Sequence, residues 1–291
     1  MNKEQIKEKI ESEDIEIALL FQGIYLKYGY DFGNYSNSHM KRRILRRISI
    51  AGLDNISQLQ YKVLYDENFF KTLLSDFSIN VTEMFRDPSF YKEFRKSVVP
   101  ILKTYPFVRI WHAGCSTGEE VYSMAILLKE EGLYERAQIY ATDFNTTVLE
   151  KAKEGIYAID DIKDYTRNYQ KAGGIASFAD YYTAKYDSVI IDQSLKKKIT
   201  FAEHNLVTDG VFGEMHVIIC RNVLIYFNRD LQNNVINLFS DSLSNGCFLC
   251  LGSKESVKFS RSSDNFEAFS ESEKIYRKKY LIKLVGDINE Q

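Results

Sequence analysis

The sequence predicts an α/β fold in which a mostly parallel sheet carries helices on both faces and follows a small helical domain. Beyond residue 107, apolar strand-like segments alternate with amphipathic helical segments, which is typical of a parallel sheet. Up to about residue 86, apolar residues recur at helical spacing and strand signals are few. The three prolines of the chain lie between these two regions and mark the domain junction: Pro88, Pro100 and Pro106.

The first predicted domain, residues 1–86, is helical. Apolar residues at intervals of three and four predict four helices, near residues 4–28, 38–51, 56–65 and 67–77. Residues 87–107 form a connecting segment, in which a proline can start or stop a helix without the loss of a sheet hydrogen bond.

The helix expected near residues 38–51 carries a dense run of positive charge. Five of the seven residues from Lys41 to Arg47 are basic: Lys41, Arg42, Arg43, Arg46 and Arg47. Ile44, Leu45 and Ile48 form an apolar stripe on the same helix, so we expect one packed face and one cationic face. Such a face is either a solvated surface or a docking site for an acidic partner, and the charge run alone favours the solvated surface.

The second predicted domain spans residues 108–284 and is followed by a tail, residues 285–291. Strands are expected near 107–114, 137–143, 199–206, 216–223 and 247–253, and helices near 119–131, 146–155 and 229–243. Segments 265–272 and 274–283 have no helix between them, which predicts an antiparallel hairpin at the sheet edge. A tyrosine-rich stretch at about 160–198 interrupts the alternation and predicts an inserted subdomain with short strands.

Composition and charge limit the class of protein. The 291 residues are 45% hydrophobic and 27% charged, which is ordinary for a globular protein. No apolar run approaches the roughly 18 residues of a membrane span, and the N-terminus lacks a signal-peptide pattern, so we expect a cytoplasmic protein without direct membrane insertion. A net charge of −2 gives no overall attraction to nucleic acid. Cys247 and Cys250 have C-x-x-C spacing, but no second pair completes a zinc site, so no metal is predicted.

The stretch IWHAGCSTGEEVYSMAILLKE, residues 110–130, combines a strand, a glycine-bearing loop and a helix start. Free backbone N–H groups and the positive end of the helix dipole would face a ligand over this loop. Gly114 and Gly118 permit close backbone approach, and the loop lacks both the G-x-G-x-x-G dinucleotide pattern and the P-loop lysine. Glu119 and Glu120 begin the helix, where a carboxylate either compensates the helix dipole or contacts a ligand.

The following strands also end in polar residues. Asp143 ends the second strand, where a carboxylate can accept hydrogen bonds from both hydroxyls of a ribose. Two further strands run into Asn205 and Leu206 and into Arg221, Asn222 and Tyr226. Because ligands bind beyond the carboxyl ends of parallel strands, four neighbouring strands ending this way predict one pocket at one rim.

An ordered set of motifs resembles a known family. The segments NVTEMFRDPSFY, WHAGCSTGEEVYSMA, IYATDFNTTVLEKAKEGIY, FAEHNL, ICRNVLIYF and LGSKES resemble those of the CheR-type chemotaxis receptor methyltransferases. The resemblance implies a Rossmann-like class I methyltransferase sheet behind a helical domain. It also implies S-adenosyl-L-methionine as cofactor, S-adenosyl-L-homocysteine as product, and glutamate side chains of a receptor as substrate.

The resemblance assigns residues to the cofactor. By position it implies contacts from Asn80, Thr82, Arg86, Glu119, Asp143, Asn205, Leu206, Arg221 and Asn222, and Gly114 in the glycine loop joins this set. Arg86 suits the carboxylate of the methionine portion, because a guanidinium binds a carboxylate through two hydrogen bonds.

The chemistry needs few catalytic groups. A glutamate is already an anion at neutral pH, so methyl transfer to its carboxylate requires positioning and no general base. Arg221 and Tyr226 are the candidates to orient the substrate carboxylate, although Tyr226 is as consistent with a packing role. With an acidic receptor helix as substrate, Arg42, Arg43, Arg46 and Arg47 become a docking face, and the expected partner is the cytoplasmic domain of a chemoreceptor or receptor-like signalling protein.

Three other functions were weighed against this one. A nucleic-acid amino methyltransferase would have prolines after the fourth strand, where this chain reads CRNVLIYF. A small-molecule O-methyltransferase would leave the basic helix unexplained. A non-catalytic S-adenosylmethionine-binding signalling module is the alternative from a different class, and its expected mark would be the loss of cofactor residues.

Overall fold

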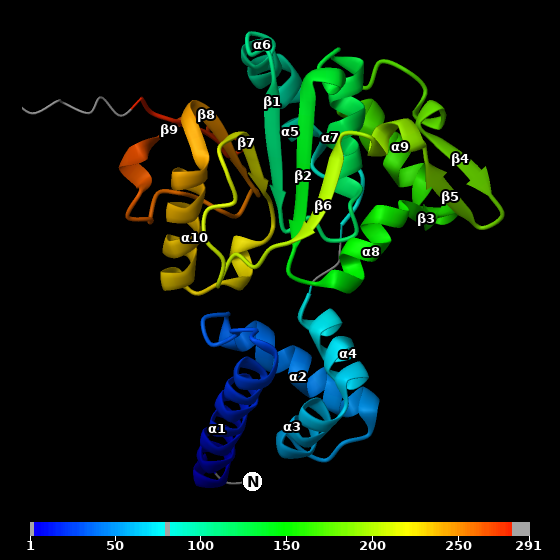
Figure 1. The fold of residues 1–291 in the computed structure, drawn as a ribbon. Coiled ribbons are helices and arrows are strands. Elements are labelled where there is room, and N and C mark those ends of the chain that lie inside the picture. The colour runs from blue at the N-terminus through cyan, green and yellow to red at the C-terminus, as the bar shows by residue number, and fades with distance from the viewer. Residues whose placement is uncertain (1–2, 79–81, 281–291) are drawn as a thin grey trace, which may run out of the picture.

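The computed structural model describes residues 3–78 and 82–280, with side chains from residue 12 onward (Figure 1). The N-terminal part consists of α1 (Lys3–Tyr28), α2 (Asn37–Ala51), α3 (Ile56–Tyr65) and α4 (Glu67–Phe77). The four predicted helices are confirmed. Asn55 and Asp66 cap α3 and α4 by accepting hydrogen bonds from backbone N–H groups of the first turn.

One detail of α2 differs from the prediction. Met40, Ile44 and Ile48 are buried, whereas Leu45 is 42% exposed. Residues four apart share one face of a helix, and Leu45 is turned about 100° from Ile44. The packed stripe of α2 therefore follows the i, i+4, i+8 spacing, and Leu45 lies on the solvent side.

A short helical segment connects the two parts. It consists of α5 (Pro88–Glu93), the π-helical turn η1 (Phe94–Val98) and α6 (Val99–Leu102). Pro88 occupies the first turn of α5, where its missing N–H leaves no hydrogen bond unmade. The large apolar side chains of this segment, Phe90, Tyr91 and Phe94, are buried.

The second part is built on a seven-stranded sheet of order β6-β2-β1-β7-β8-β10-β9. The bounds are β1 (Val108–Ala113), β2 (Ala137–Asp143), β6 (Ile199–Glu203), β7 (Met215–Cys220), β8 (Leu243–Leu251), β9 (Phe266–Ser270) and β10 (Ile275–Lys278). The strands β6, β2, β1, β7 and β8 run parallel, and β10 and β9 are antiparallel. The predicted edge hairpin is therefore confirmed.

Side chains alternate between the two faces of this sheet. In β1, Val108 and Ile110 pack with α7 (Glu119–Glu130), while Trp111 and Ala113 pack with α10 (Arg229–Ser242). The remaining helix, α8 (Thr146–Glu154), follows β2. Helices thus cover both faces, as the alternating pattern predicts (Figure 1).

The inserted segment forms a small antiparallel sheet of order β3-β5-β4, with β3 (Ile156–Ala158), β4 (Tyr182–Lys185) and β5 (Ser188–Ile191). The inserted segment thus begins at β3, four residues before its predicted start. It also contains a helix, α9 (Ile162–Lys171), that the tyrosine-rich pattern did not indicate.

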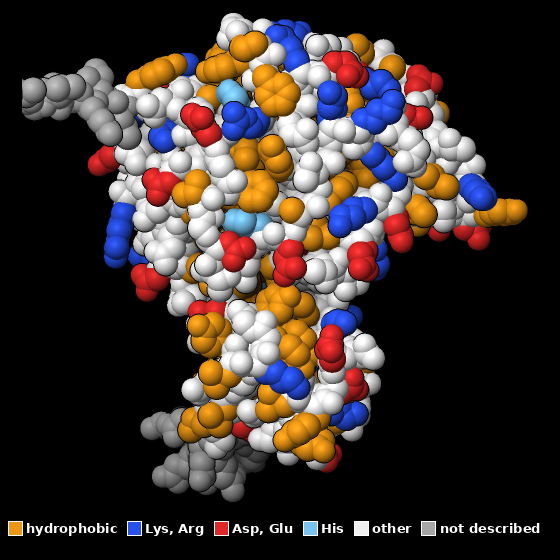
Figure 2. Space-filling view, in the orientation of Figure 1, with side chains coloured by type: hydrophobic (Ala, Val, Ile, Leu, Met, Phe, Trp, Pro, Cys, Tyr) orange, Lys and Arg blue, Asp and Glu red, His pale blue; other side chains and the backbone are white. Residues whose placement is uncertain are grey.

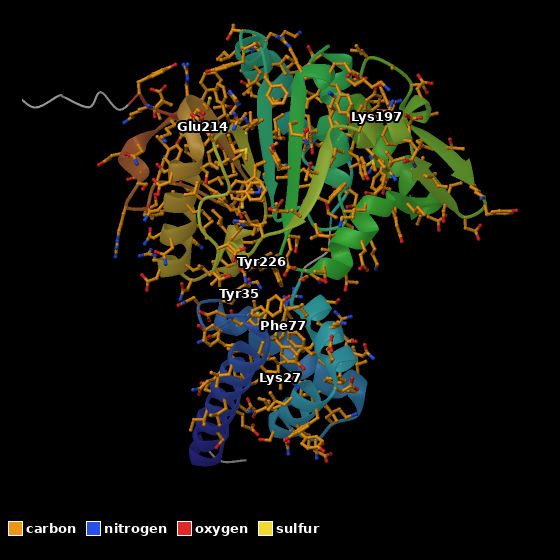
Figure 3. The ribbon with its side chains drawn as sticks, in the orientation of Figure 1. Lys27, Tyr35, Phe77, Lys197, Glu214 and Tyr226 are labelled. Carbon is orange, nitrogen blue, oxygen red and sulfur yellow. The ribbon has the colours of Figure 1, made fainter. Side chains whose placement is uncertain are left out.

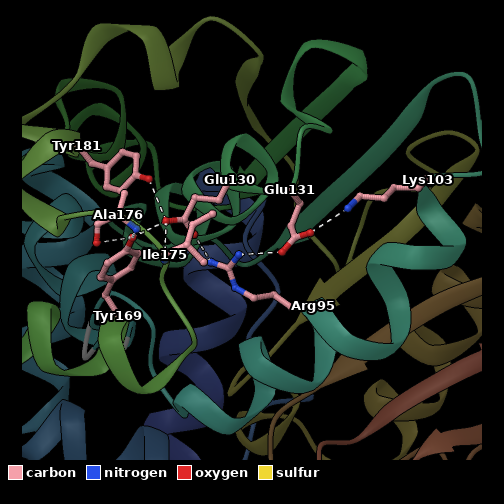
Figure 4. A network of polar contacts seen from close by, with 8 residues as sticks. All are labelled: Arg95, Lys103, Glu130, Glu131, Tyr169, Ile175, Ala176 and Tyr181. Atoms are coloured by element: carbon pink, nitrogen blue, oxygen red, sulfur yellow. Dashed lines mark hydrogen bonds and ion pairs between the residues drawn. The ribbon is translucent and has the colours of Figure 1, made fainter.

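A polar network fixes the insert to α7 (Figure 4). Glu130 accepts hydrogen bonds from the hydroxyls of Tyr169 and Tyr181 and pairs with Arg95. Its neighbour Glu131 lies 3.2 Å from Arg95. Because the Glu130 side chain is only 2% exposed, these partners are needed to keep its charge inside the protein.

Residues 3–78 and 82–280 contain no helix that is both long and apolar enough to cross a membrane.

In the space-filling view, hydrophobic side chains gather at the narrow junction between the helical part and the sheet part (Figure 2).

Candidate functional site

A pocket opens between the helical part and the carboxyl ends of β6, β2, β1 and β7. It holds about 1020 Å³ of space, including the solvent at its mouth. Figure 3 shows Tyr35 and Phe77 of the helical part facing Tyr226 of the sheet part across this junction. The strand order places the four predicted strand ends side by side, which confirms that they share one rim.

Main-chain contacts join the two parts beside the pocket. The Ser36 N–H donates to the Tyr226 carbonyl at 2.8 Å, and the Asn228 N–H donates to the Asn34 carbonyl at 2.9 Å. Asn145 also donates its side-chain amide to the Ser78 hydroxyl at 3.0 Å. These contacts fix Tyr226 to the residue that directly precedes α2.

The glycine loop supplies a surface without side chains. Gly114 has a φ of +84°, and a Cβ at this position would lie 2.7 Å from Val223 Cγ2. Its N–H and that of Cys115 both donate to the Thr142 carbonyl at 2.8 Å. Only glycine tolerates both the positive φ and the close approach of Val223, so Gly114 keeps the loop against β2 and lines the pocket.

Asp143 is 8% exposed at the end of β2. One carboxylate oxygen accepts from the Ser116 N–H and the other from the Asn145 N–H, both at 3.0 Å. Burial raises the pKa of Asp143 to about 6, and these backbone hydrogen bonds oppose the rise. A carboxylate has about four acceptor positions, so Asp143 retains capacity to accept a hydrogen bond from a ligand in the pocket that it lines.

The placement of the two acidic residues at the start of α7 differs from the prediction. The pocket wall includes Glu120 and leaves out Glu119, which accepts from the Thr117 hydroxyl. Burial and then the charge of Glu119 raise the pKa of Tyr157 and Tyr165, which places this carboxylate on the side of the insert. Consecutive helix residues point about 100° apart, so only one of the two can face the pocket.

Glu120 is part of a buried charge network. Its two oxygens lie 3.1 Å from His112 Nδ1 and 3.1 Å from Arg221 Nη1. Burial raises the pKa of Glu120, but the His112 hydrogen bond and the Arg221 charge outweigh it, and the pKa is lowered. For Glu119, burial dominates and raises the pKa to about 7.

Arg221 is held on three sides, although it lines the pocket. Its side chain is 2% exposed, Nη2 lies 2.7 Å from Asp87 Oδ2, and the guanidinium lies 4.3 Å above the Phe90 ring. Both terminal nitrogens already have carboxylate partners. This arrangement differs from the expectation that Arg221 orients the substrate, because the group is engaged within the protein.

Asn222 follows Arg221 with a φ of +62° and lines the pocket. Glu255, from the LGSKES motif, holds this turn by accepting from the Gly252 N–H at 2.6 Å and from the Asn222 N–H at 3.0 Å. The sequence did not suggest this role for Glu255, because a buried carboxylate that caps a distant turn has no local pattern.

Tyr226 lies between the pocket and the basic helix. Its ring meets the His39 ring edge-on at a centroid distance of 5.7 Å. Burial raises its pKa, and the charges of Arg43 and Arg86 partly oppose this, so both arginines are near the hydroxyl.

Of the other predicted residues, Thr82, Arg86, Asn205 and Leu206 line the pocket. Asn80 lies outside the described residues. Sequence reasoning missed an aromatic wall made of Tyr35, Phe77, Phe144 and Phe227. Two of these come from the helical part, and only the tertiary structure brings them to the rim.

The predicted docking residues divide into two pairs. Arg42 and Arg46 are exposed, whereas Arg43 donates to the Asp76 carbonyl and Arg47 pairs with the Asp76 carboxylate. Arg43 and Arg47 therefore join α2 to α4, and Arg42 and Arg46 present their charges to solvent.

Among the described side chains, no cluster of His, Cys, Asp or Glu residues is arranged to hold a metal ion. The four cysteines are buried free thiols: Cys115, Cys220, Cys247 and Cys250. Burial raises the pKa of each of these thiols.

The fold and the pocket define a class of protein. A seven-stranded sheet with a hairpin at one edge, a glycine loop after β1 and an acid at the end of β2 is the architecture of a Rossmann-like S-adenosylmethionine-dependent methyltransferase. The chain belongs to the CheR methyltransferase family. The SAM binding domain of that family matches residues 80–275, and its all-alpha domain matches residues 15–78.

Relatives agree with this assignment. The chain is 54% identical to the Pseudomonas putida protein Cher3, over 91% of this chain and 97% of the relative. It is 29% identical to a chemotaxis protein methyltransferase of Listeria innocua, over 79% and 85% of the two chains. It is 27% identical to the chemotaxis protein methyltransferase of Salmonella typhimurium, over 86% and 87%.

The pocket fits the cofactor of this family. Gly114 and Asp143 both line the pocket, and the Asp143 carboxylate is the acceptor that ribose hydroxyls require. The aromatic wall supplies apolar surface for a flat ring system.

Proposed function

We propose that this protein transfers a methyl group from S-adenosylmethionine to glutamate side chains on the cytoplasmic domain of a chemoreceptor or receptor-like signalling protein. The observation that carries the proposal is the position of the pocket. Tyr226 lines the pocket, and its carbonyl accepts a hydrogen bond from the Ser36 N–H. The basic helix α2 begins at the residue after Ser36. A cofactor pocket beside a cationic helix suits a substrate that is both anionic and macromolecular.

The cofactor would be held by residues of the rim and the junction. Asp143 would accept hydrogen bonds from the ribose, Arg86 would bind the methionyl carboxylate, and the Gly114 backbone would line the pocket between them. Thr82, Asn205, Leu206 and Asn222 complete this set, and Glu120 takes the place that the family resemblance implies for Glu119.

The cofactor supplies an electrophilic methyl group, which the glutamate oxygen takes as the sulfonium becomes a neutral thioether. The remaining task of the protein is to hold the acceptor oxygen about 3 Å from the methyl carbon and in line with the sulfur. A tyrosine hydroxyl is protonated at neutral pH, and burial raises the pKa of Tyr226 further, so this hydroxyl can donate to the other oxygen of the substrate carboxylate. Arg221 instead supports the pocket wall.

The basic helix would bind the substrate next to this point. At a rise of 1.5 Å per residue, Arg42 and Arg46 lie about 8 Å and about 14 Å along α2 from its first residue. Exposed guanidinium groups at this distance can bind carboxylates of a receptor helix whose acceptor glutamate reaches Tyr226. The chemotaxis methyltransferases among the relatives support this class of partner.

The test is transfer of labelled methyl from S-adenosylmethionine to purified cytoplasmic domains of receptors. Label on the protein that base releases as methanol is expected, because a carboxyl methyl ester hydrolyses under base. The Tyr226→Phe variant should lower kcat with little change in cofactor affinity. Cofactor binding with no transfer to any candidate would overturn the proposal and favour a non-catalytic signalling module; label in small molecules alone would indicate a small-molecule O-methyltransferase.

A further inference from the structure

Arg86 lines the pocket from a turn at the junction, residues 85–87, and the residues on either side of it have a strained backbone conformation. Phe85 has a φ of +53° and Asp87 has a φ of +54°. Neither residue is glycine, and a bulky side chain such as Phe rarely adopts the left-handed region. Such a conformation costs on the order of 1 kcal/mol or more and persists only where surrounding contacts fix it.

Three contacts fix this turn, one from Ser123 and two from Arg221. The Phe85 N–H donates to the Ser123 hydroxyl of α7 at 2.8 Å. On the other side, the Asp87 carboxylate lies 2.7 Å from Arg221 Nη2, and Arg221 Nη1 donates to the Arg86 carbonyl at 3.3 Å. Arg221 thus holds both the side chain and the main chain of the turn.

Arg221 is itself buried and has fixed partners within the protein. Its Nη1 lies 3.1 Å from Glu120, which His112 contacts from β1, and its side chain is 2% exposed above Phe90. The Asp87 side chain, by contrast, is 45% exposed and lies outside the pocket wall. Asp87 therefore does not contact the pocket itself, and it can affect the pocket only by fixing the turn 85–87.

We propose that Asp87 is a positioning residue of the cofactor site: its ion pair with Arg221 holds the turn 85–87 on the sheet rim and thereby places Arg86 for the cofactor. The proposal rests on the cofactor pocket and on the part proposed for Arg86, and it does not depend on which protein is methylated. It also gives Arg221 a task that its burial permits.

The Asp87→Asn variant tests the ion pair without adding backbone strain, because Asn tolerates the left-handed region better than other non-glycine residues. We expect the Kd for S-adenosylmethionine, measured by calorimetry, to rise about tenfold. The KM for the cofactor should rise in parallel, while kcat at saturating cofactor stays near that of the wild type. Asp164→Asn is the matched control, since Asp164 forms an exposed ion pair with Arg167 at 2.9 Å on α9, away from the pocket wall.

A double-mutant cycle separates positioning from a general loss of structure. In an Arg86→Ala background, Asp87→Asn should have no further effect on the Kd, because the side chain that it places is gone. An additive effect, or an unchanged Kd in Asp87→Asn alone, would overturn the proposal. Asp87→Glu keeps the charge and should restore part of the affinity. In thermal unfolding without cofactor, Asp87→Asn and Asp87→Glu should each have a melting temperature within a few degrees of the wild type.

Discussion

The sheet rim and the basic helix hold their functional side chains in different ways. At the rim, Asp143 is buried and bonded to backbone N–H groups on both oxygens, so its position is set before any ligand arrives. On α2, Arg42 and Arg46 are exposed, and only their neighbours Arg43 and Arg47 are tied to Asp76. One side of the site is preorganised, and the other presents solvent-exposed charge.

This difference suits the two ligands that we propose. A small cofactor is bound by a few short hydrogen bonds, and their cost in entropy is lowest when the groups are already fixed. A protein helix is first attracted by charge, which depends on ionic strength and tolerates loose geometry. Changes at the rim should therefore act on cofactor affinity, and changes on α2 should act on the protein substrate.

The largest effect is expected at Asp143. Asp143→Asn retains an oxygen for one backbone N–H but removes the charge that would strengthen hydrogen bonds to a ribose. The Kd for S-adenosylmethionine, measured by calorimetry, should rise about 100-fold, at about 1.5 to 3 kcal/mol for a hydrogen bond to a charged group. Because the pKa of Asp143 is about 6, affinity in the wild type should also fall as the pH drops through 6.

The control for this change is Asp192→Asn. Asp192 also accepts hydrogen bonds from a residue two positions on, Ser194, but lies in the insert outside the pocket wall. It should leave the cofactor Kd unchanged. An equal loss of affinity in both variants would mean that the rim is no more specialised than an ordinary turn.

An effect on stability alone, and none on cofactor affinity, is expected at Glu119. Its pKa is about 7 in the folded chain against 4.5 in the unfolded chain, so the folded chain keeps a proton that the unfolded chain releases. Between these two values stability falls as the pH rises. Glu119→Gln should remove that fall and raise the free energy of unfolding by about 3 kcal/mol at pH 8, with little change near pH 4.

Urea unfolding at the two pH values measures this effect, with the exposed Glu154→Gln as the control. The cofactor Kd should not change in Glu119→Gln, because its carboxylate faces the insert. A large loss of affinity would instead support the contact that the sequence resemblance assigned to Glu119.

The positions of Glu119 and Glu120 show which features of the site the sequence could not predict. Strand ends are set by hydrophobic runs that stop at polar residues, so Asp143, Asn205 and Asn222 could be placed at one rim without a structure. The choice between Glu119 and Glu120 depends on the rotation of α7 about its axis, and two adjacent carboxylates carry no signal for it. The same limit explains Leu45, which hydrophobicity placed in the packed stripe and which faces solvent.

Ion pairs between residues far apart in the sequence could not be predicted either. Arg221 was recognised as a site residue, but its commitment to Asp87 and Glu120 joins positions 134 and 101 residues away. Asp76, which divides the arginines of α2 into two pairs, is likewise distant from them in sequence. Such pairings follow from the packing of whole elements, which local patterns do not encode.

The docking helix gives the smallest effect and the sharpest test of the contrast between the two sides. The double variant Arg42→Glu/Arg46→Glu reverses two exposed charges four residues apart without touching Asp76. We expect the KM for the receptor domain to rise about tenfold, since exposed ion pairs contribute up to about 1 kcal/mol each, while the cofactor Kd stays the same.

Lys92→Glu/Lys96→Glu makes the same charge change at the same spacing on the exposed surface of the connecting segment, and its KM should stay near that of the wild type. Raising the salt concentration should raise the KM of the wild type and reduce the difference between it and the α2 variant, because screening removes the attraction that the variant lacks. An equal rise of KM in both double variants would assign the attraction to net charge. A rise confined to the α2 variant would locate docking at Arg42 and Arg46, beside the tyrosine that faces the pocket.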